Sequence, residues 1–163
     1  MKRSSQRIIL PSLLDRLVDL EPGKRSEAAM ARALTLAQMK VSVRRDLEWL
    51  LNSRRTPVEP PASAGELRRS VYYYGLPDVT GLAISSLEDH HKLAASLESA
   101  IAAFEPRLLR AVVTVQGAES ERRQLRFQIE ALLRAEPAPA RVHFDTTLEL
   151  STGRYEVGGE LHA

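Results

Sequence analysis

The chain contains no cysteine, which excludes disulfide bonds, thiolate nucleophiles and zinc sites with cysteine ligands. It also lacks any apolar run near the ~18 residues that a membrane-spanning helix needs. The N-terminus begins with basic residues, but the apolar stretch that follows them ends at Pro11, so we expect no secretory signal peptide. These absences fit a cytosolic protein, and the length of 163 residues predicts one domain, or one domain with arms.

Aromatic side chains and net charge are also scarce. Aromatic residues make up 5% of the chain, and 23 basic residues nearly balance 21 acidic ones, which leaves a net charge of +2. A dedicated nucleic-acid-binding protein carries a clear positive charge and aromatic side chains for base stacking, so we expect no nucleic acid as partner. Arginine supplies 19 of the 23 basic residues. This excess has two interpretations: a GC-rich coding bias, or many arginine–carboxylate contacts within the chain or to partners.

The first segment of the chain is an amphipathic stretch. Residues 7–22 place leucines and a valine on one face of a helix, and Pro22-Gly23 ends the stretch. An isolated helix of this length is marginal in water, so it needs its own domain or a partner to dock on. We therefore expect residues 1–25 to be an N-terminal amphipathic arm and residues 26–163 to form a single domain.

Helical periodicity predicts two further helices. One ends at Asn52 and begins either as early as Thr35 or after a cap at Ser42. The other covers residues 86–104, with Ser86 and Asp89 resembling a capping box. The three prolines in residues 56–66 predict a loop between them. The side chains expected on the buried stripes are Leu36, Met39, Val43, Leu47, Leu50 and Leu51 in the first helix, and Leu87, Ala94, Leu97, Ile101 and Phe104 in the second.

After the second of these helices the hydrophobic period changes to two. Apolar and polar residues alternate over 109–115, 125–133 and 142–150, and residues 154–157 can return as a short last strand. In the first of these segments the side chains expected on the buried face are Leu109, Ala111, Val113 and Val115. The predicted fold class is α+β, with N-terminal helices packed on one face of a small antiparallel sheet formed by the C-terminal half.

A search for catalytic residue sets finds little. The chain has no glycine-rich phosphate loop, no G-x-S-x-G turn and no H-E-x-x-H sequence. His90 and His91 are neighbours and point about 100° apart on a helix, so they cannot easily share a metal. His143 falls on the polar face of a strand and His162 near the C-terminus. We expect all four histidines to be solvated surface side chains, and we expect no catalytic residue, metal or cofactor.

A sharper local feature is the sequence Glu105-Pro106-Arg107, between the second helix and the first strand. Pro106 keeps Glu105 out of the helical conformation, so Glu105 and Arg107 project to the same side of an extended segment. One interpretation is a local ion pair, worth ~0–1 kcal/mol if it is exposed. The other is a preformed polar contact for a partner, and removing one member of a pair buried in an interface costs ~3–5 kcal/mol.

The segment 70–82 holds three of the four tyrosines together with Gly75, Pro77 and Gly81. Tyrosines in such a turn-rich segment can bury their rings while their hydroxyl groups bind backbone atoms. The segment is either a contact for a partner or a loop attached to the core.

Four sequence blocks occur together in a recognisable order and spacing. They are RIILPSLLDRLVDLEP at 7–22, RRDLEWLLNSRR at 44–55, SVYYYGLPDVTG at 70–81 and AFEPRL at 103–108. On these blocks the chain resembles the TssE family of type VI secretion baseplate wedge subunits, which is similar to a small wedge protein of contractile phage baseplates. The resemblance covers roughly residues 7–157.

The resemblance implies a compact α+β fold and a structural role in the cytoplasm, at the inner face of the cytoplasmic membrane. The family joins the wedge built with TssF, TssG and TssK to the first ring of the TssB/TssC sheath. By position, Glu105, Pro106 and Arg107 would be the family's wedge-contact motif, and the C-terminal strands would mimic a sheath subunit and pair with sheath strands. The chain departs from the family pattern at Tyr73, where asparagine is commoner, and at Ser53, where threonine is usual.

Two alternative functions stay open at this point. The family's label as lysozyme-like suggests a peptidoglycan-cleaving enzyme, which would need export and a pair of carboxylates in a cleft. The arginine excess suggests a nucleic-acid-binding module. The structural hypothesis predicts that Arg107→Ala leaves the fold intact but abolishes wedge binding.

Overall fold

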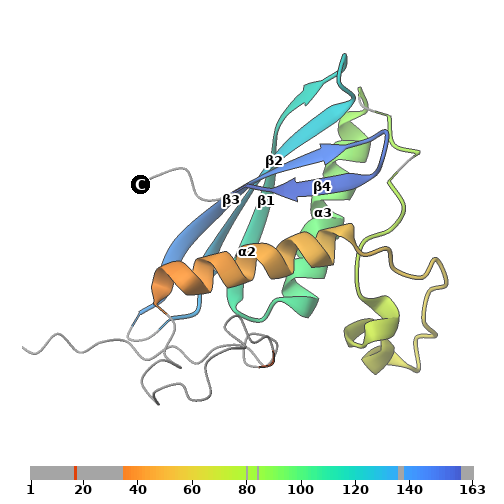
Figure 1. The fold of residues 1–163 in the computed structure, drawn as a ribbon. Coiled ribbons are helices and arrows are strands. Elements are labelled where there is room, and N and C mark those ends of the chain that lie inside the picture. Colours follow the sequence, from red (N-terminus) through yellow and green to blue (C-terminus); the bar gives the residue numbers. More distant parts are fainter. Residues whose placement is uncertain (1–16, 18–34, 80, 84, 136–137, 159–163) are drawn as a thin grey trace, which may run out of the picture.

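Figure 1 shows the computed structural model, which describes residue 17 and residues 35–79, 81–83, 85–135 and 138–158. The elements in chain order are α2 (Leu36–Asn52), the short 3-10 helices η2 (Gly65–Arg69) and η3 (Val71–Tyr73), α3 (Leu87–Phe104), β1 (Leu108–Glu119), β2 (Gln124–Leu133), β3 (Ala140–Glu149) and β4 (Arg154–Val157). The predicted arm over residues 1–25, apart from Leu17, and His162 lie outside the described residues. Helices followed by an antiparallel sheet confirm the predicted α+β class.

Helix α2 begins at the earlier of the two predicted starts. The Thr35 hydroxyl accepts a hydrogen bond from the Gln38 N–H (3.2 Å), and the Gln38 side chain accepts one from the Thr35 N–H (2.9 Å). This reciprocal cap satisfies two N–H groups that the first turn leaves without helical partners. The alternative cap at Ser42 was wrong, because Ser42 is a buried residue inside the helix. The predicted apolar stripe is confirmed, with Met39, Val43, Leu47, Leu50 and Leu51 buried and Leu36 packed at the edge of the core.

Helix α3 is capped by Ser86, whose hydroxyl accepts a hydrogen bond from the Asp89 N–H (3.1 Å). The Asp89 carboxylate accepts a hydrogen bond from the Ala83 N–H (3.0 Å) and so ties the preceding loop to the helix start. The predicted side-chain cap is therefore present, but Asp89 binds Ala83 and not the Ser86 backbone.

Two side chains of α3 contradict the sequence-based expectation. His90 is 7% exposed, not a solvated surface residue, because it lies on the same helical face as Leu93, Ala94 and Leu97. Leu87, expected on the buried stripe, lies in the first turn and is exposed. His91 is exposed as predicted, and His143 is half-buried on the polar side of β3.

The four strands lie in the order β1-β2-β3-β4, and each pairs antiparallel with the next. At the centre of the sheet, Ile129 of β2 pairs with Val113 of β1 and with Phe144 of β3. The alternation predicted for β2 and β3 is confirmed: the buried side chains are Leu125, Phe127, Ile129, Ala131 and Leu133 in β2, and Val142, Phe144, Thr146 and Leu148 in β3.

Strand β1 departs from simple alternation. Val113 is buried and Ala111 and Val115 are half-buried and packed against the core, as expected, whereas the buried residue at the start of the strand is Leu108 and not Leu109. The register shifts between Leu109 and Val112, where Arg110 has a positive φ of 54°. This irregularity inserts an extra residue and moves the buried face from one parity to the other, which no period-two pattern can anticipate.

Both helices and all four strands contribute to one buried apolar cluster. α3 packs against β1, α2 packs against β4, and the two helices contact each other. The alternate side chains of β2 and β3 point away from this core. Figure 1 shows α2, α3 and the four strands. Fully burying a side chain such as Leu47 or Ile129 stabilises the fold by about 1.5–3 kcal/mol relative to leaving it exposed.

Candidate interaction site

Glu105, Pro106 and Arg107 form the turn between α3 and β1. Glu105 is the C-cap of α3, and its N–H donates to the Ile101 carbonyl. The Glu105 carbonyl accepts from the Leu108 N–H (3.0 Å), which closes the turn. Pro106 is exposed at the apex of this turn. Proline has no backbone N–H, so this position leaves no donor without a partner.

The Arg107 guanidinium binds acceptors from two elements. Its Nε donates to Glu105 Oε1 (2.6 Å) and its Nη2 to Glu105 Oε2 (2.5 Å), a bidentate pair within the turn. Nη2 also donates to Asp46 Oδ2 (2.5 Å), and Nη1 donates to the Ser42 hydroxyl (3.2 Å). Asp46 and Ser42 lie one turn apart on α2, so the motif joins the α3–β1 turn to that helix.

This network is largely buried. The exposed fractions of the side chains are 6% for Glu105, 17% for Asp46 and 19% for Arg107. Burial alone would lower the pKa of Arg107, but the hydrogen bonds and charges of Glu105 and Asp46 outweigh burial and raise that pKa above its usual value. Arg107 is therefore charged at any pH at which the protein folds. The exposed, weak ion pair considered from the sequence is not what the structure contains.

Sequence reasoning placed Glu105 and Arg107 side by side correctly but missed Asp46 and Ser42. Both lie more than 60 residues earlier in the chain. The available signal was their spacing of four residues in α2, which puts one carboxylate and one hydroxyl on the same helical face.

The tyrosine segment lies beside this turn. The Tyr74 ring packs edge-to-face on Phe104 at 5.2 Å between ring centroids, and burial, with the charges of Asp46 and Glu105, raises the pKa of its hydroxyl. The Arg55 N–H donates to the Leu76 carbonyl (2.9 Å), and the Leu76 N–H donates to the Ser53 carbonyl (2.8 Å). These contacts support the interpretation of this part as a loop attached to the core.

Tyr73 is bound by charged side chains that lie outside the apolar core. Its hydroxyl donates to Glu59 Oε1 (2.7 Å), and the guanidinium groups of Arg55 and Arg68 lie 4.4 and 5.6 Å from its ring centroid. Burial and the hydrogen bond to Glu59 raise the pKa of Tyr73. This cluster attaches the proline loop to η2 and η3.

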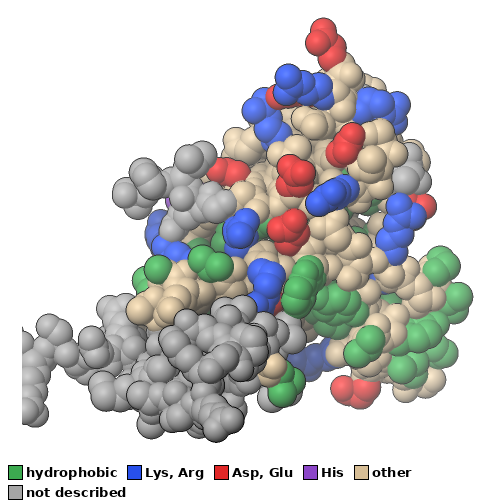
Figure 2. Space-filling model, viewed as in Figure 1, with side chains coloured by type: hydrophobic (Ala, Val, Ile, Leu, Met, Phe, Trp, Pro, Cys, Tyr) green, Lys and Arg blue, Asp and Glu red, His purple; other side chains and the backbone are tan. Residues whose placement is uncertain are grey.

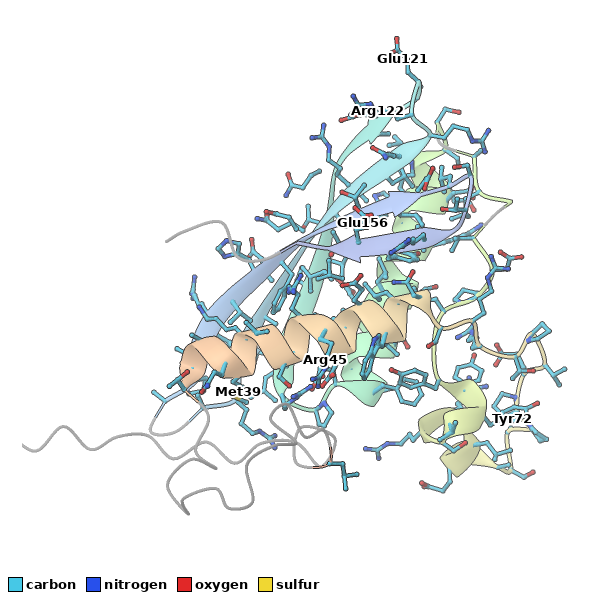
Figure 3. All side chains as sticks on the ribbon, viewed as in Figure 1. Met39, Arg45, Tyr72, Glu121, Arg122 and Glu156 are labelled. Atoms are coloured by element: carbon cyan, nitrogen blue, oxygen red, sulfur yellow. The ribbon has the colours of Figure 1, made fainter. Side chains whose placement is uncertain are left out.

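The outer surface of the same segment is apolar. Figure 2 shows hydrophobic side chains gathered over the segment that carries η2 and η3, and Val71 there is 90% exposed. Tyr72, labelled in Figure 3, is exposed next to it. A contiguous exposed apolar patch rimmed by polar residues is typical of a protein–protein contact. The segment thus combines an anchored inner side with an apolar outer side.

Comparison with known proteins identifies the family. A sequence profile described as "Baseplate wedge protein gp25" matches residues 37–138, which is more than half of the chain. The chain belongs to the gp25 baseplate wedge protein family. The matched residues run from the first turn of α2 to the loop before β3, and the resemblance drawn from the sequence blocks is confirmed.

The other comparisons add less. The chain is similar to one solved chain in a structure entitled "The baseplate complex from the type VI secretion system", with 18% sequence identity and a TM-score of 0.46. The match covers 75% of this chain and 95% of that one. No curated protein matches the chain.

This gp25-family chain protects the outer edge of β4 with side chains of α2. The Asn52 amide donates to the Tyr155 carbonyl (2.8 Å) and accepts from the Tyr155 N–H (2.9 Å), and Arg44 donates to the Val157 carbonyl (3.3 Å). Asn52 thus makes with Tyr155 the two hydrogen bonds that a residue of a further strand would make. An edge whose backbone groups are already bound resists casual pairing with other chains.

Strand β1, at the other side of the sheet, is protected differently. The Glu98 carboxylate of α3 accepts from the Val113 N–H (2.8 Å). A second register shift, between Val115 and Gly117, further interrupts the strand. Bulges and side-chain caps of this kind keep an edge from templating aggregation.

We expect Asn52→Ala to weaken the protection of β4. Two hydrogen bonds to Tyr155 are lost, at about 0.5–1.5 kcal/mol each, so the free energy of unfolding falls by about 1–3 kcal/mol and the Tyr155 amide exchanges faster with solvent. Urea unfolding and hydrogen exchange measure the two effects. The control is Gln116→Ala, which removes the Gln116–Gln128 hydrogen bond on the open face of the sheet, the face that points away from the apolar core. It should change neither the free energy of unfolding nor the exchange of the Tyr155 amide by much. Unchanged exchange at Tyr155 in Asn52→Ala would contradict the assigned role.

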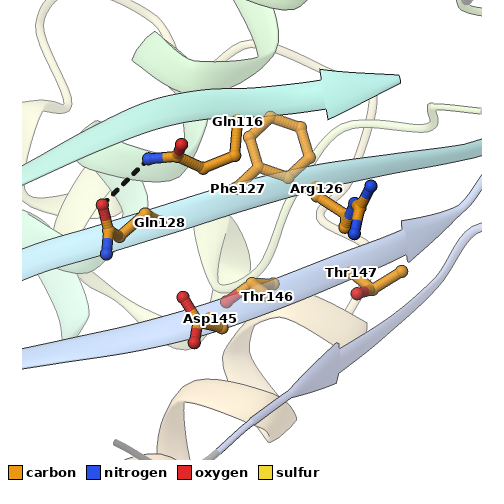
Figure 4. Close-up of a pocket in the computed structure, with 7 residues that line it drawn as sticks. All are labelled: Gln116, Arg126, Phe127, Gln128, Asp145, Thr146 and Thr147. Carbon is orange, nitrogen blue, oxygen red and sulfur yellow. Dashed lines mark hydrogen bonds between the residues drawn. The ribbon is translucent and has the colours of Figure 1, made fainter. Parts of the chain in front are cut away.

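The open face of the sheet carries a polar hollow of about 510 Å³, shown in Figure 4. Gln116, Arg126, Gln128, Asp145 and Thr147 line it, and Asp145 is its one carboxylate among the described residues. Glycoside hydrolysis requires two carboxylates across a cleft, so this hollow lacks the set that peptidoglycan cleavage requires.

Among the residues that the structure describes, no group of three or more histidine, aspartate or glutamate side chains could hold a metal ion. Within the same residues, no helix is long and apolar enough to cross a membrane.

Proposed function

We propose that this protein is a non-enzymatic structural component of a type VI secretion baseplate in the cytoplasm, at the inner face of the cytoplasmic membrane. It connects the wedge formed with TssF, TssG and TssK to the first ring of the TssB/TssC sheath. Membership of the gp25 baseplate wedge family carries the proposal. The four sequence blocks, spread over residues 7–108, assign it to the type VI branch of that family.

The wedge contact is proposed at Glu105, Pro106 and Arg107. The ion pairs to Glu105 and Asp46 leave the guanidinium little freedom, and Pro106 projects from the apex. A partner that binds a surface already held in place loses less conformational entropy than one that must order it. This rigidity supports a contact through the rim of the turn, with the buried carboxylates as its support.

Pro106→Glu tests this contact while leaving the ion network in place. The chain is tagged at native expression and mildly crosslinked, and co-purified wedge proteins are quantified. We expect a loss of TssF, TssG and TssK by about tenfold or more, since one unpaired charge buried in an interface costs more than 1.4 kcal/mol. The thermal unfolding midpoint should stay within about 3 °C of the parent chain.

The matched control is Arg122→Glu, an exposed charge change in the β1–β2 turn, far from the motif (Figure 3). It should retain all three wedge proteins. If folded Pro106→Glu also retains them, the turn is not the wedge contact. If the unchanged chain recovers neither wedge nor sheath proteins, the baseplate proposal itself is wrong.

The sheath contact is proposed at the C-terminal strands. Strand β4 has four residues and borders the sheet, which fits the addition of a strand from TssB or TssC. An incoming strand that pairs with β4 has to displace Asn52 from Tyr155 and Arg44 from Val157. These side chains then act as a reversible cover, so the edge opens to a partner that supplies a full ladder of hydrogen bonds.

A further inference from the structure

A polar hollow of about 430 Å³ lies between α2 and β4. The side chains that line it are Arg44, Arg45, Glu48, Trp49 and Asn52 of α2 and Arg154 of β4. Two of these, Asn52 and Arg44, are the side chains that bind the backbone of β4. Three arginines and one glutamate give the walls a net positive charge, so the hollow favours an acidic group as its occupant.

The three arginines differ in how far their charges are already neutralised. Arg45, which projects from α2 in Figure 3, forms an ion pair with Asp46 (2.8 Å), and its guanidinium lies 5.1 Å from the centroid of the Trp49 ring. Among the described residues, neither Arg44 nor Arg154 forms an ion pair. These two arginines therefore supply the positive charge that an acidic group can bind.

A carboxylate of this chain lies opposite Arg154 but is bound elsewhere. Glu149 pairs with Arg154 in the β3–β4 ladder, and its carboxylate accepts hydrogen bonds from the hydroxyls of Ser151 (2.8 Å) and Thr152 (3.0 Å). These two hydrogen bonds, and to a smaller extent the charge of Arg154, lower the pKa of Glu149. Glu149 thus does not occupy the hollow, which it does not line.

Asn52 marks the position of the partner side chain that reaches the hollow. It makes with Tyr155 both hydrogen bonds that a directly opposite residue of an antiparallel strand would make. Directly opposite residues project to the same face of a sheet, and Tyr155 is 1% exposed and belongs to the core between the sheet and the helices. The residue that replaces Asn52 therefore projects toward α2, on the side where the hollow lies.

Addition of a strand to β4 takes acceptors away from α2. Arg44 gives up the Val157 carbonyl, and a donor that loses its partner without a replacement costs free energy. A carboxylate in the hollow is a stronger acceptor for a guanidinium than the carbonyl that was lost. We propose that the sheath strand that adds to β4 carries an aspartate or glutamate opposite Tyr155, and that Arg44 and Arg154 bind its carboxylate in this hollow.

Trp49 adds an apolar surface to the same hollow. Its side chain is 50% exposed, and a chain that lies over the hollow covers part of the ring. Excluding water from the hollow strengthens an arginine–carboxylate contact, because the local dielectric constant falls. Tryptophan and arginine are also the residue types most enriched among those that dominate binding at interfaces.

The inference rests on the proposed sheath contact at β4 and adds the chemistry of the partner strand. It gives the cover of the edge a selective role. A strand that offers backbone hydrogen bonds but no carboxylate displaces Arg44 and Asn52 without replacing their partners. Such a strand binds less tightly, so the edge opens preferentially to an acidic partner.

A crosslink without a spacer tests the contact directly. Arg154→Lys places an amine in the hollow, and a carbodiimide joins an amine to a carboxylate that touches it. The tagged chain is treated in baseplates assembled at native expression, and the crosslinked peptides are identified by mass spectrometry. We expect position 154 to be joined to an aspartate or glutamate of TssB or TssC. The control is Arg141→Lys, the same change at an exposed residue of β3 that does not line the hollow, and it should not give this crosslink.

The outcomes separate this inference from the proposed function. If TssB and TssC co-purify but position 154 is joined only to Glu48 or Glu149 of this chain, to a protein outside the sheath, or to nothing, the acidic partner residue is wrong and the sheath contact stands. If the unchanged chain recovers no sheath protein, the sheath contact fails and the inference falls with it.

Charge reversal gives a second measurement. Arg154→Glu places a like charge where the partner carboxylate binds, so we expect the recovery of TssB and TssC to fall about tenfold or more, with TssF, TssG and TssK unchanged. Arg141→Glu is the matched control and should retain both sets of proteins. Full recovery of the sheath proteins by folded Arg154→Glu would show that no partner carboxylate binds in the hollow.

Discussion

Arg107→Ala is expected to lower the free energy of unfolding by about 3–5 kcal/mol, because it leaves the buried Glu105 carboxylate without its cation and removes one of the two arginines that bind the half-buried Asp46. The Glu105 side chain is 6% exposed and loses its bidentate partner, whereas Asp46 keeps its ion pair with Arg45. Native domains have about 5–15 kcal/mol of stability in total, so the variant is partly unfolded under mild stress. Urea unfolding of the purified chain measures the change.

The control is Arg126→Ala, which removes an arginine–carboxylate pair of similar length from the open face. Arg126 lies 2.8 Å from Glu119, but its side chain is 58% exposed. Exposed pairs contribute about 0–1 kcal/mol, so the control should lose no more than that. Equal losses in the two variants would show that burial does not distinguish the Arg107 network from a surface pair.

This result would revise the expectation that Arg107→Ala leaves the fold intact. If Arg107→Ala loses both stability and wedge binding, the result does not show whether Arg107 contacts the wedge directly or only stabilises the turn. Both losses would follow from a loosened turn. Pro106→Glu, whose side chain takes no part in the ion network, carries the test of binding instead. Arg107→Ala then reports how far the network holds the turn in its binding conformation.

The sequence predicted what depends on period and local chemistry. The stripes of α2 and α3, the alternation of β2 and β3 and the adjacent Glu105 and Arg107 all follow from side-chain direction within one element. The prediction was wrong at Leu109, since the register shift that follows it puts Leu108, and not Leu109, on the buried face. It was also wrong at His90, which was expected at the surface because histidine is polar. Its position on the buried face of α3 decides its burial.

What the sequence could not predict depends on contacts between distant elements. Asp46 reaches Arg107 only because α2 packs across the end of α3, and Asn52 reaches Tyr155 across more than 100 residues of chain. The sequence predicts that the helix ends at Asn52, and α2 does end there. A side chain that ends a helix has amide groups left for another element, and only the packed fold shows which one.

Gly75→Ala is expected to be as damaging as the loss of Arg107. Gly75 has a φ of +105°, and a Cβ at this position would lie 2.2 Å from the Ser53 carbonyl oxygen. That oxygen is the acceptor for the Leu76 N–H, so an alanine has to break the contact that ties the tyrosine segment to the end of α2. Backbone strain of about 1–3 kcal/mol, with two backbone hydrogen bonds of about 0.5–1.5 kcal/mol each, predicts a total loss of about 2–6 kcal/mol.

Gly81→Ala is the matched control in the same segment. A Cβ there meets nothing within 4 Å, so the substitution should change the unfolding free energy by less than about 1 kcal/mol, and in the stabilising direction if the unfolded chain loses freedom. Urea unfolding compares the two variants. If Gly75→Ala unfolds like the parent chain, the Ser53–Leu76 contact does not hold the segment. If it unfolds early, the edge-to-face contact of Tyr74 with Phe104, next to the Glu105 turn, is lost with it. The tyrosine segment would then be a support for the proposed wedge contact as well as a surface of its own.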